Sequence, residues 1–226
     1  MAKLVKTRSY DRMGLPTDAR ITGLARAADG SIYALCDDGP CIVTLDSSLR
    51  TASTAPIAAP DTTARAKSIA VAADGSVGVL FDRPAMLCQF KWEQNAWSTA
   101  GCRPLQDVAF ATGLISATNN EWVVVDSWGD SVVRWASNGS THRIGSRGVA
   151  DGQMWLPGAA ALGVNGDLYV VDSGNHRAQR FGANGEWQMT FSLGRSYTRA
   201  RTADEVLKIR KKTDSSVDPK AKGVVQ

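Results

Sequence analysis

Short apolar runs separated by turn residues recur along the chain with a period of about 45 residues. In each repeat a turn rich in Asp, Asn and Gly is followed by a β-branched and aromatic run that ends in aspartate. Successive turns are 45, 45 and 46 residues apart. The turn pairs are Asp29-Gly30, Asp74-Gly75, Asn119-Asn120 and Asn165-Gly166. Such runs predict β-strands, and their near-continuous apolarity predicts burial on both faces.

Each repeat has room for four strands joined by tight turns. A run of small apolar residues precedes each turn, and two further apolar runs, separated by a second turn, follow the aspartate. Helical repeats of this period would need amphipathic stripes, and none is found before residue 203. We therefore predict an all-β fold, a β-propeller of about four four-stranded blades within residues 15–194. The predicted blades are 15–57, 66–101, 105–148 and 156–194.

The fourth repeat carries a sequence motif in addition to the period. Residues 165–181 read NGDLYVVDSGNHRAQRF, with Asn175-His176-Arg177 at the turn that follows the aspartate. This segment resembles an NHL repeat, a β-propeller unit named for its Asn-His-Leu-like turn. The third repeat is similar over residues 125–135, so the resemblance covers about 110–194 in motif and 15–194 in period. It implies a β-propeller, and propellers of this family typically have about six blades.

Four repeats raise the question of how the propeller closes. Either the chain forms a four-bladed ring, or it forms an arc that another chain completes, because a propeller closes to protect its sheet edges. Residues 4–10 predict an extra N-terminal strand within residues 1–14, and the fourth repeat already has its own outer strand. We expect the extra strand to pair with a neighbour or with an open edge.

An aspartate recurs at the end of the apolar run that follows the first turn of each repeat, and two interpretations are possible. Four carboxylates in a ring could hold a metal ion, whereas an Asp at the start of a tight turn caps it by accepting backbone N–H groups. We expect the capping role, which the NHL resemblance also implies. The residues assigned this structural role are Asp37, Asp82, Asp126, Asp172, Asn175 and His176.

The sequence shows no recognisable catalytic constellation. The chain has two histidines, His142 and His176, which excludes a three-histidine metal site and weakens the option of an amidating lyase of the same superfamily. The spacings GxSxG, HExxH and the P-loop are also missing. We therefore expect no catalytic residue, no metal and no cofactor.

The positive charge of the chain is concentrated in its C-terminal segment. Of the formal net charge of +4, residues 195–226 contribute +5 and residues 1–194 contribute −1. A neutral body argues against nucleic-acid binding by the propeller. In the basic tail, 195–226, residues 202–212 predict a short helix with Thr202 as N-cap, and we expect the tail to dock on a neighbouring subunit.

Two tryptophans and the basic tail are the candidate partner contacts. Trp128 lies in a predicted turn and Trp155 in a connection between blades, where side chains reach the faces that propellers use for binding. The basic candidates are Arg199, Arg201, Lys208, Arg210, Lys211 and Lys212.

Cysteine usage and the N-terminus bear on the cellular compartment. Cys36, Cys41, Cys88 and Cys102 show no CxxC spacing, and the first residues lack the apolar core of a secretory signal. No stretch is long and apolar enough to predict a membrane helix. We therefore expect reduced thiols in a protein of the cytoplasm or of a phage particle.

Three functions remain open. The main expectation is a non-catalytic interaction or structural subunit of a larger assembly, whose partners are protein subunits, either further copies of the chain or virion proteins. The first alternative is a metal-dependent propeller hydrolase or lyase with the recurrent aspartates as ligands, and the second is a single-stranded RNA-binding propeller.

Overall fold

A computed structural model describes residues 20–192, except residues 38, 47, 49–50, 118–120 and 137. The chain divides into two compact units, Met1–Phe191 and Ser192–Gln226. The predicted N-terminal strand, the predicted tail helix and the six basic tail candidates lie outside the described residues. Within the described part, no helix has the length and apolarity needed to cross a membrane.

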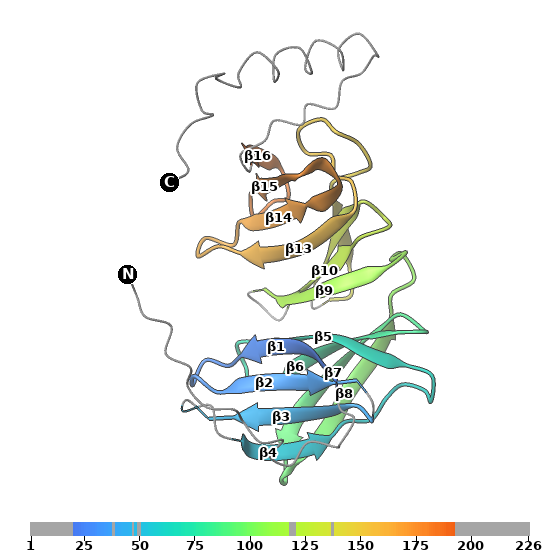
Figure 1. Cartoon of the computed structure of the whole chain (residues 1–226), viewed down its shortest axis with the longest axis vertical. Helices are drawn as coiled ribbons and strands as arrows, with labels where there is room; N and C mark the ends of the chain where they lie inside the picture. The colour runs from blue at the N-terminus through green and yellow to red at the C-terminus, as the bar shows by residue number, and fades with distance from the viewer. Residues whose placement is uncertain are drawn as a thin grey trace, which may run out of the picture. The chain divides into compact units, whose positions relative to one another are not determined.

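The described residues form four antiparallel four-stranded sheets, and each sheet has its strands in sequence order (Figure 1). Each sheet is one blade. Blade 1 contains β1 (Ile21–Arg26), β2 (Ile32–Cys36), β3 (Cys41–Leu45) and β4 (Thr51–Pro56). Blade 2 contains β5 (Arg65–Val71), β6 (Val77–Asp82), β7 (Met86–Glu93) and β8 (Ala96–Pro104). Blade 3 contains β9 (Ala111–Ser116), β10 (Trp122–Asp126), β11 (Ser131–Trp135) and β12 (Thr141–Ile144). Blade 4 contains β13 (Pro157–Leu162), β14 (Leu168–Asp172), β15 (Arg177–Phe181) and β16 (Trp187–Ser192).

Asp-Gly turns join the first and second strands in blades 1 and 2, and Asn165-Gly166 lies at the corresponding turn of blade 4. In blade 1 the Ser31 N–H donates to Asp29 Oδ1 at 2.9 Å, and in blade 2 the Ser76 N–H donates to Asp74 Oδ1 at 3.0 Å. The Ser76 hydroxyl also donates to Asp74 Oδ1, at 2.6 Å, and these hydrogen bonds hold the pKa of both carboxyl groups below the usual value. The following glycines have positive φ, as at Gly75 with φ of 81°, which a side chain would disfavour. The turn residues therefore fix the hairpins locally.

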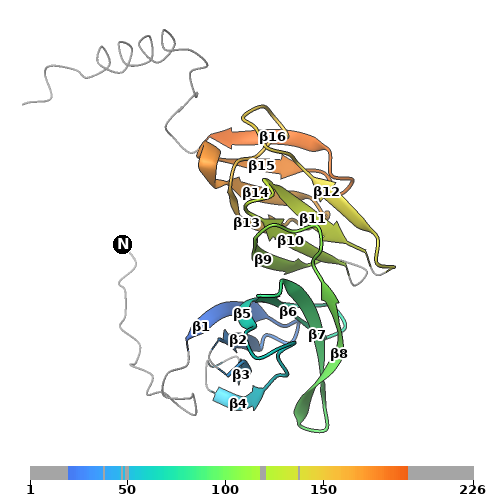
Figure 2. The same cartoon turned by 90° about the vertical axis from the view of Figure 1, so that its right-hand side faces the viewer.

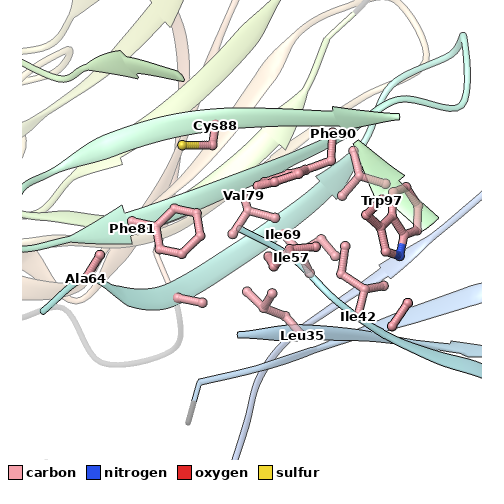
Figure 3. Close-up of a cluster of buried hydrophobic side chains, with 13 residues drawn as sticks. Leu35, Ile42, Ile57, Ala64, Ile69, Val79, Phe81, Cys88, Phe90 and Trp97 are labelled. Atoms are coloured by element: carbon pink, nitrogen blue, oxygen red, sulfur yellow. The ribbon is translucent and has the colours of Figure 1, made fainter. Parts of the chain in front are cut away.

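Neighbouring blades pack through their first strands. Strand β1 contacts β5, β5 contacts β9, and β9 contacts β13, so the blades follow one another in sequence order (Figures 1 and 2). Apolar clusters fill the three interfaces between consecutive blades. Figure 3 shows the cluster between blades 1 and 2, where Leu35 and Ile42 face Ile69 and Val79. The core is therefore divided among the interfaces between blades.

Close packing at one interface depends on a glycine. Gly78 of β6 lies against the Trp122 ring of blade 3, and a Cβ at position 78 would be 2.5 Å from Trp122 Cζ3. The Trp122 side chain is buried, as are Trp97 and Trp135. The large aromatic residue thus fits between blades because the facing residue has no side chain.

The cysteines correct the expectation of uniformly reduced thiols. Cys88 and Cys102 are directly opposite on β7 and β8 and form a disulfide. Cys36 and Cys41 are also opposite one another, on β2 and β3, but remain free and buried. The position of Cys36 opposite Cys41 follows from the short turn between them. The position of Cys88 opposite Cys102 depends on a strand register that the sequence did not reveal.

Candidate functional site

A β-bulge occurs at the same place in the first strand of every blade. The register of each first strand against its second strand shifts by one residue near the start of the first strand. The extra residues are Thr22, Lys67, Thr112 and Gly158, which are spaced by 45, 45 and 46 residues. Bulges redirect a side chain and are frequent next to active sites. The repeat therefore presents four equivalent redirected positions, which we call the bulge row.

The bulge row lies at one end of the blades. Each bulge is opposite the last residues of the second strand, beside the turn to the third strand. The connections from the preceding blade enter the first strands at the same end, as shown by the Ser127 N–H, which donates to the Phe110 carbonyl. We call this end of the blades the hairpin face.

Three members of the bulge row are small or bonded to backbone. Thr22 Oγ1 donates to the Ala66 carbonyl at 2.9 Å, which ties blade 1 to blade 2. Thr112 Oγ1 lies 3.5 Å from the Val125 carbonyl of its own blade. At Gly158 a Cβ would be 2.5 Å from Ser173 Oγ, so a side chain there would displace the turn.

Lys67 is the charged member of the bulge row. Its ammonium Nζ lies 3.1 Å from Asp82 Oδ2, and the Lys67 side chain is 36% exposed against 19% for Asp82. Asp82 Oδ1 is buried without a hydrogen-bond partner and lies 3.9 Å from Arg83 Nε, so the Lys67 ammonium is the nearer of two cations beside this carboxylate. Asp82 uses one of the three ammonium donors. The pair thus holds a half-exposed cation in place at the hairpin face.

The recurrent aspartates fall into two structural classes. In the strand register, Asp126 and Asp172 occupy the position of Cys36 and Phe81, because all four lie opposite the residue that precedes the bulge. Asp37 and Asp82 follow that position by one residue. The four carboxylates are therefore not equivalent, although each sequence run ends in Asp.

Asp126 and Asp172 fasten the hairpin to the connection that enters the blade. Asp126 accepts the N–H groups of Ala109, Phe110 and Gly129 at 2.9 to 3.2 Å. Arg143 Nη1 also lies 3.2 Å from Asp126 Oδ2. Both aspartates are fully buried. The geometry is that of a buried anchor whose oxygen atoms are occupied.

The fourth blade repeats this anchor with more partners. Asp172 accepts the Trp155 N–H at 2.7 Å and is ion-paired with Arg177 Nε at 2.7 Å. Asn175 Nδ2 donates to Asp172 and to the Gly148 carbonyl. His176 has φ of 54° and ends the short 3-10 turn η2 (Ser173–Asn175), where its N–H donates to the Ser173 carbonyl. The Asn-His turn therefore braces the anchor.

The residues do not form the carboxylate metal site that one alternative requires. Over the described ranges, no three His, Cys, Asp or Glu side chains gather into a possible ligand set. Asp126 and Asp172 are in different blades and are engaged by N–H groups and arginines. No reaction step is therefore assigned to a metal held by these aspartates.

The two tryptophan candidates lie on the hairpin face in different environments. Trp128 is 67% exposed and stacks on Phe110, with ring centroids 4.8 Å apart and an interplanar angle of 24°. Trp155 is only partly exposed and packs against Gly174, whose N–H donates to the Trp155 carbonyl at 2.7 Å. The sequence pattern did not point to Phe110, which directly precedes β9. The period of the repeat was the signal that could have located the bulge row.

Comparisons with known proteins identify the fold. No family model and no curated protein matches the chain. A catalytically inactive variant of virginiamycin B lyase from Staphylococcus aureus, solved with Quinupristin, is 14% identical, with a TM-score of 0.60 over 80% of this chain and 58% of that chain. A luciferin-regenerating enzyme is 13% identical, with a TM-score of 0.56 over 78% and 64%. A structure of the nidogen/laminin complex is 18% identical, with a TM-score of 0.56 over 73% and 61%.

The fold is a β-propeller. The prediction of an all-β chain with four four-stranded blades is confirmed. The chain spans about three fifths of the length of these three neighbours. At these identities the likeness concerns the fold, and no family model supports the NHL assignment.

The comparisons correct the main functional expectation. A non-catalytic structural subunit was predicted, but propellers with this fold include a lyase and a luciferin-regenerating enzyme. That finding favours the hydrolase or lyase alternative over the structural role. Spaced sequence motifs report residues that are close along the chain, whereas Lys67 and Asp82 are brought together only by the pairing of β5 with β6.

Proposed function

We propose that this chain is part of a propeller enzyme of the hydrolase or lyase type, with its substrate bound at the hairpin face around Lys67. The observation that carries the proposal is the Lys67–Asp82 pair in the bulge row. Two enzymes among the structural neighbours support the same class. The NHL-like turn at Asn175 and His176 further supports descent of blades 3 and 4 from an NHL-type repeat.

Lys67 would supply the electrostatic part of catalysis. Ester or amide hydrolysis places negative charge on a carbonyl oxygen, and elimination beside a carbonyl group does the same through an enolate. A fixed ammonium that donates to this oxygen stabilises the transition state more than the ground state. Asp82, 3.1 Å away, restricts the position of the ammonium. Both reaction types therefore use the same arrangement.

The exposed aromatic pair on the same face would bind the apolar part of the substrate. Phe110 directly precedes β9, and β9 packs against β5, which carries Lys67. Stacked, exposed rings offer area for aromatic or apolar groups at low conformational cost. The proposed substrate is therefore a carbonyl compound with an aromatic or apolar portion.

The test uses Quinupristin, the compound bound in the structure of one neighbour, and a set of simpler substrates. Quinupristin and a panel of aryl esters are incubated with the purified chain, and the products are followed by mass spectrometry. Lys67→Met should lower kcat/KM by about 100-fold or more. The matched control is Lys91→Met, because exposed Lys91 of β7 loses the same charge away from the hairpin face.

Two results would contradict the proposal. Turnover that survives in Lys67→Met would remove Lys67 from the reaction centre. Equal losses in Lys67→Met and Lys91→Met would indicate an effect of net charge alone.

A further inference from the structure

Along each strand, side chains point alternately towards the following blade and towards the preceding blade. One set of positions packs on the following blade, as Leu35, Leu80 and Val125 do in blades 1, 2 and 3. The other set packs on the preceding blade, as Ile69 and Leu114 do. Each internal interface therefore joins a forward surface of one blade to a backward surface of the next.

Blade 4 has an exposed forward surface. Val171 occupies the position of Leu35, Leu80 and Val125, yet it is 43% exposed while those three are fully buried. Tyr169, which follows the same alternation, is 37% exposed and lies 6.3 Å from the Phe191 ring. The sheet thus offers apolar side chains at positions that are buried in the other blades.

The charged side chain beside the Tyr169 ring on this surface is ion-paired. Arg180 of β15 lies over the Tyr169 ring at 5.9 Å and is ion-paired with Asp167. Ala159 and Ala161 are opposite Val171 and Tyr169 on β13, so their small side chains complete the surface. The surface is therefore suited to contact with another apolar sheet.

Blade 1 has the complementary exposed surface. Leu24 occupies the backward position of Ile69 and Leu114, and it is 67% exposed against 4% and 6%. Ile21 is opposite Cys36 on the same side of the sheet and is 45% exposed. Further along this side, β2 and β3 contribute a small buried apolar cluster of Ala34, Cys36, Cys41 and Val43. The exposed part is therefore the first strand, β1.

We propose that the forward surface of blade 4 packs on the backward surface of blade 1 in a second copy of this chain. Every internal interface joins one surface of each kind, and the described blades leave exposed the forward surface of blade 4 and the β1 part of the backward surface of blade 1. Two copies joined head to tail would bury both pairs of surfaces at once, which closes the assembly. The result has eight blades, within the range of about 4–8 blades found in closed propellers.

This inference does not rest on the proposed reaction. It is tested by measuring the molecular mass of the protein in solution. The full chain is examined by light scattering after size exclusion at about 50 µM, where a dimer has twice the chain mass of 24.1 kDa. Val171→Asp and Leu24→Asp each place a charge in the interface and should weaken the dimer about 100-fold. The matched control is Val164→Asp, because Val164 is fully exposed in a turn of the same blade.

Mixing the two variants tests the head-to-tail arrangement directly. Each variant keeps one intact surface, so an equimolar mixture of Val171→Asp and Leu24→Asp should regain one intact interface and recover dimer. Circular dichroism checks that each variant is folded, which is expected because both side chains are exposed. Recovery in the mixture together with an unaffected Val164→Asp control supports the proposal.

Several outcomes would overturn it. A wild-type chain that stays monomeric at about 100 µM has no such interface. A dimer that survives Leu24→Asp but not Val171→Asp would pair two blade 4 surfaces instead. Equal weakening by Val164→Asp would show that added charge, and not the interface, controls association.

Discussion

At the scale of single residues, the blades depend on a few positions where the side chain or its absence is decisive. Asp126 accepts three backbone N–H groups from the hairpin and the incoming connection. Gly78 makes room for the Trp122 ring of the next blade. Lys67 places a cation where the other members of the bulge row are uncharged. These roles follow from contacts between segments that are distant in the sequence.

Gly78→Ala should destabilise the protein by about 1–3 kcal/mol, because the new methyl group would overlap Trp122 and force it to move. Urea unfolding followed by tryptophan fluorescence measures the change. The control is Gly101→Ala in β8, since a Cβ at position 101 meets no atom within 4 Å. Equal effects of the two substitutions would mean that the glycine contribution comes from the unfolded chain.

Asp126→Ala should destabilise the protein by about 2–4 kcal/mol, because three backbone N–H groups lose a fully buried acceptor and Arg143 loses an ion-pair partner. Asp46→Ala, at an exposed turn with a hydrogen bond to the Ser48 N–H, serves as the comparison. The measurement is again urea unfolding. A loss at position 126 no larger than at position 46 would contradict the anchor role.

At the scale of secondary-structure elements, cross-strand pairs decide how each hairpin behaves. Cys88 and Cys102 lie directly opposite one another and are bonded, whereas Cys36 and Cys41 are also opposite but remain free. Burial and the neighbouring Cys41 raise the pKa of Cys36 to about 12. The thiol therefore stays protonated in the folded protein at neutral pH.

Alkylation should distinguish the two cysteine pairs. In denatured, unreduced protein we expect two thiols to react with iodoacetamide, and four after reduction, as counted by mass spectrometry. In the native protein Cys36 should react slowly even near pH 9 because its thiolate is suppressed. Four reactive thiols without reduction would contradict the disulfide.

The same thiol predicts a pH dependence of stability. The pKa of Cys36 is raised on folding, so the folded state retains a proton that the unfolded state loses above its own pKa of about 8.5. The free energy of unfolding should therefore fall as pH rises from about 9 towards 12. A fluorescence-detected urea titration at several pH values measures this fall, and Cys36→Val should flatten it.

At the scale of the whole described body, the blades form a series in which each interface buries apolar surface of two neighbours. Repeat proteins of this kind draw stability from nearest-neighbour interfaces. Among the described blades, the outermost ones, 1 and 4, each leave one such surface exposed, at Leu24 and at Val171. An added interface would stabilise the terminal blades first.

If two copies join at these surfaces, thermal stability must depend on protein concentration. The Tm of the wild-type chain should rise by several degrees over a hundredfold increase in concentration, because association stabilises only the folded state. Val171→Asp should remove this dependence, and Val164→Asp should keep it. A Tm that is independent of concentration in all three would count against the association.

The sequence alone determined the local features of this protein. The 45-residue period, the Asp-Gly turns and the apolar runs depend on neighbouring residues, so they predicted the four-stranded blades and placed Trp128 at a turn. Hydrogen-bond register and long-range contact decided the rest. Only the tertiary structure revealed the bulge row, the Lys67–Asp82 pair and the two classes of aspartate, because each requires strands to align side by side. The exposed ends of the blade series are likewise invisible in the sequence, since Val171 and Leu80 follow the same pattern and differ only in what packs against them.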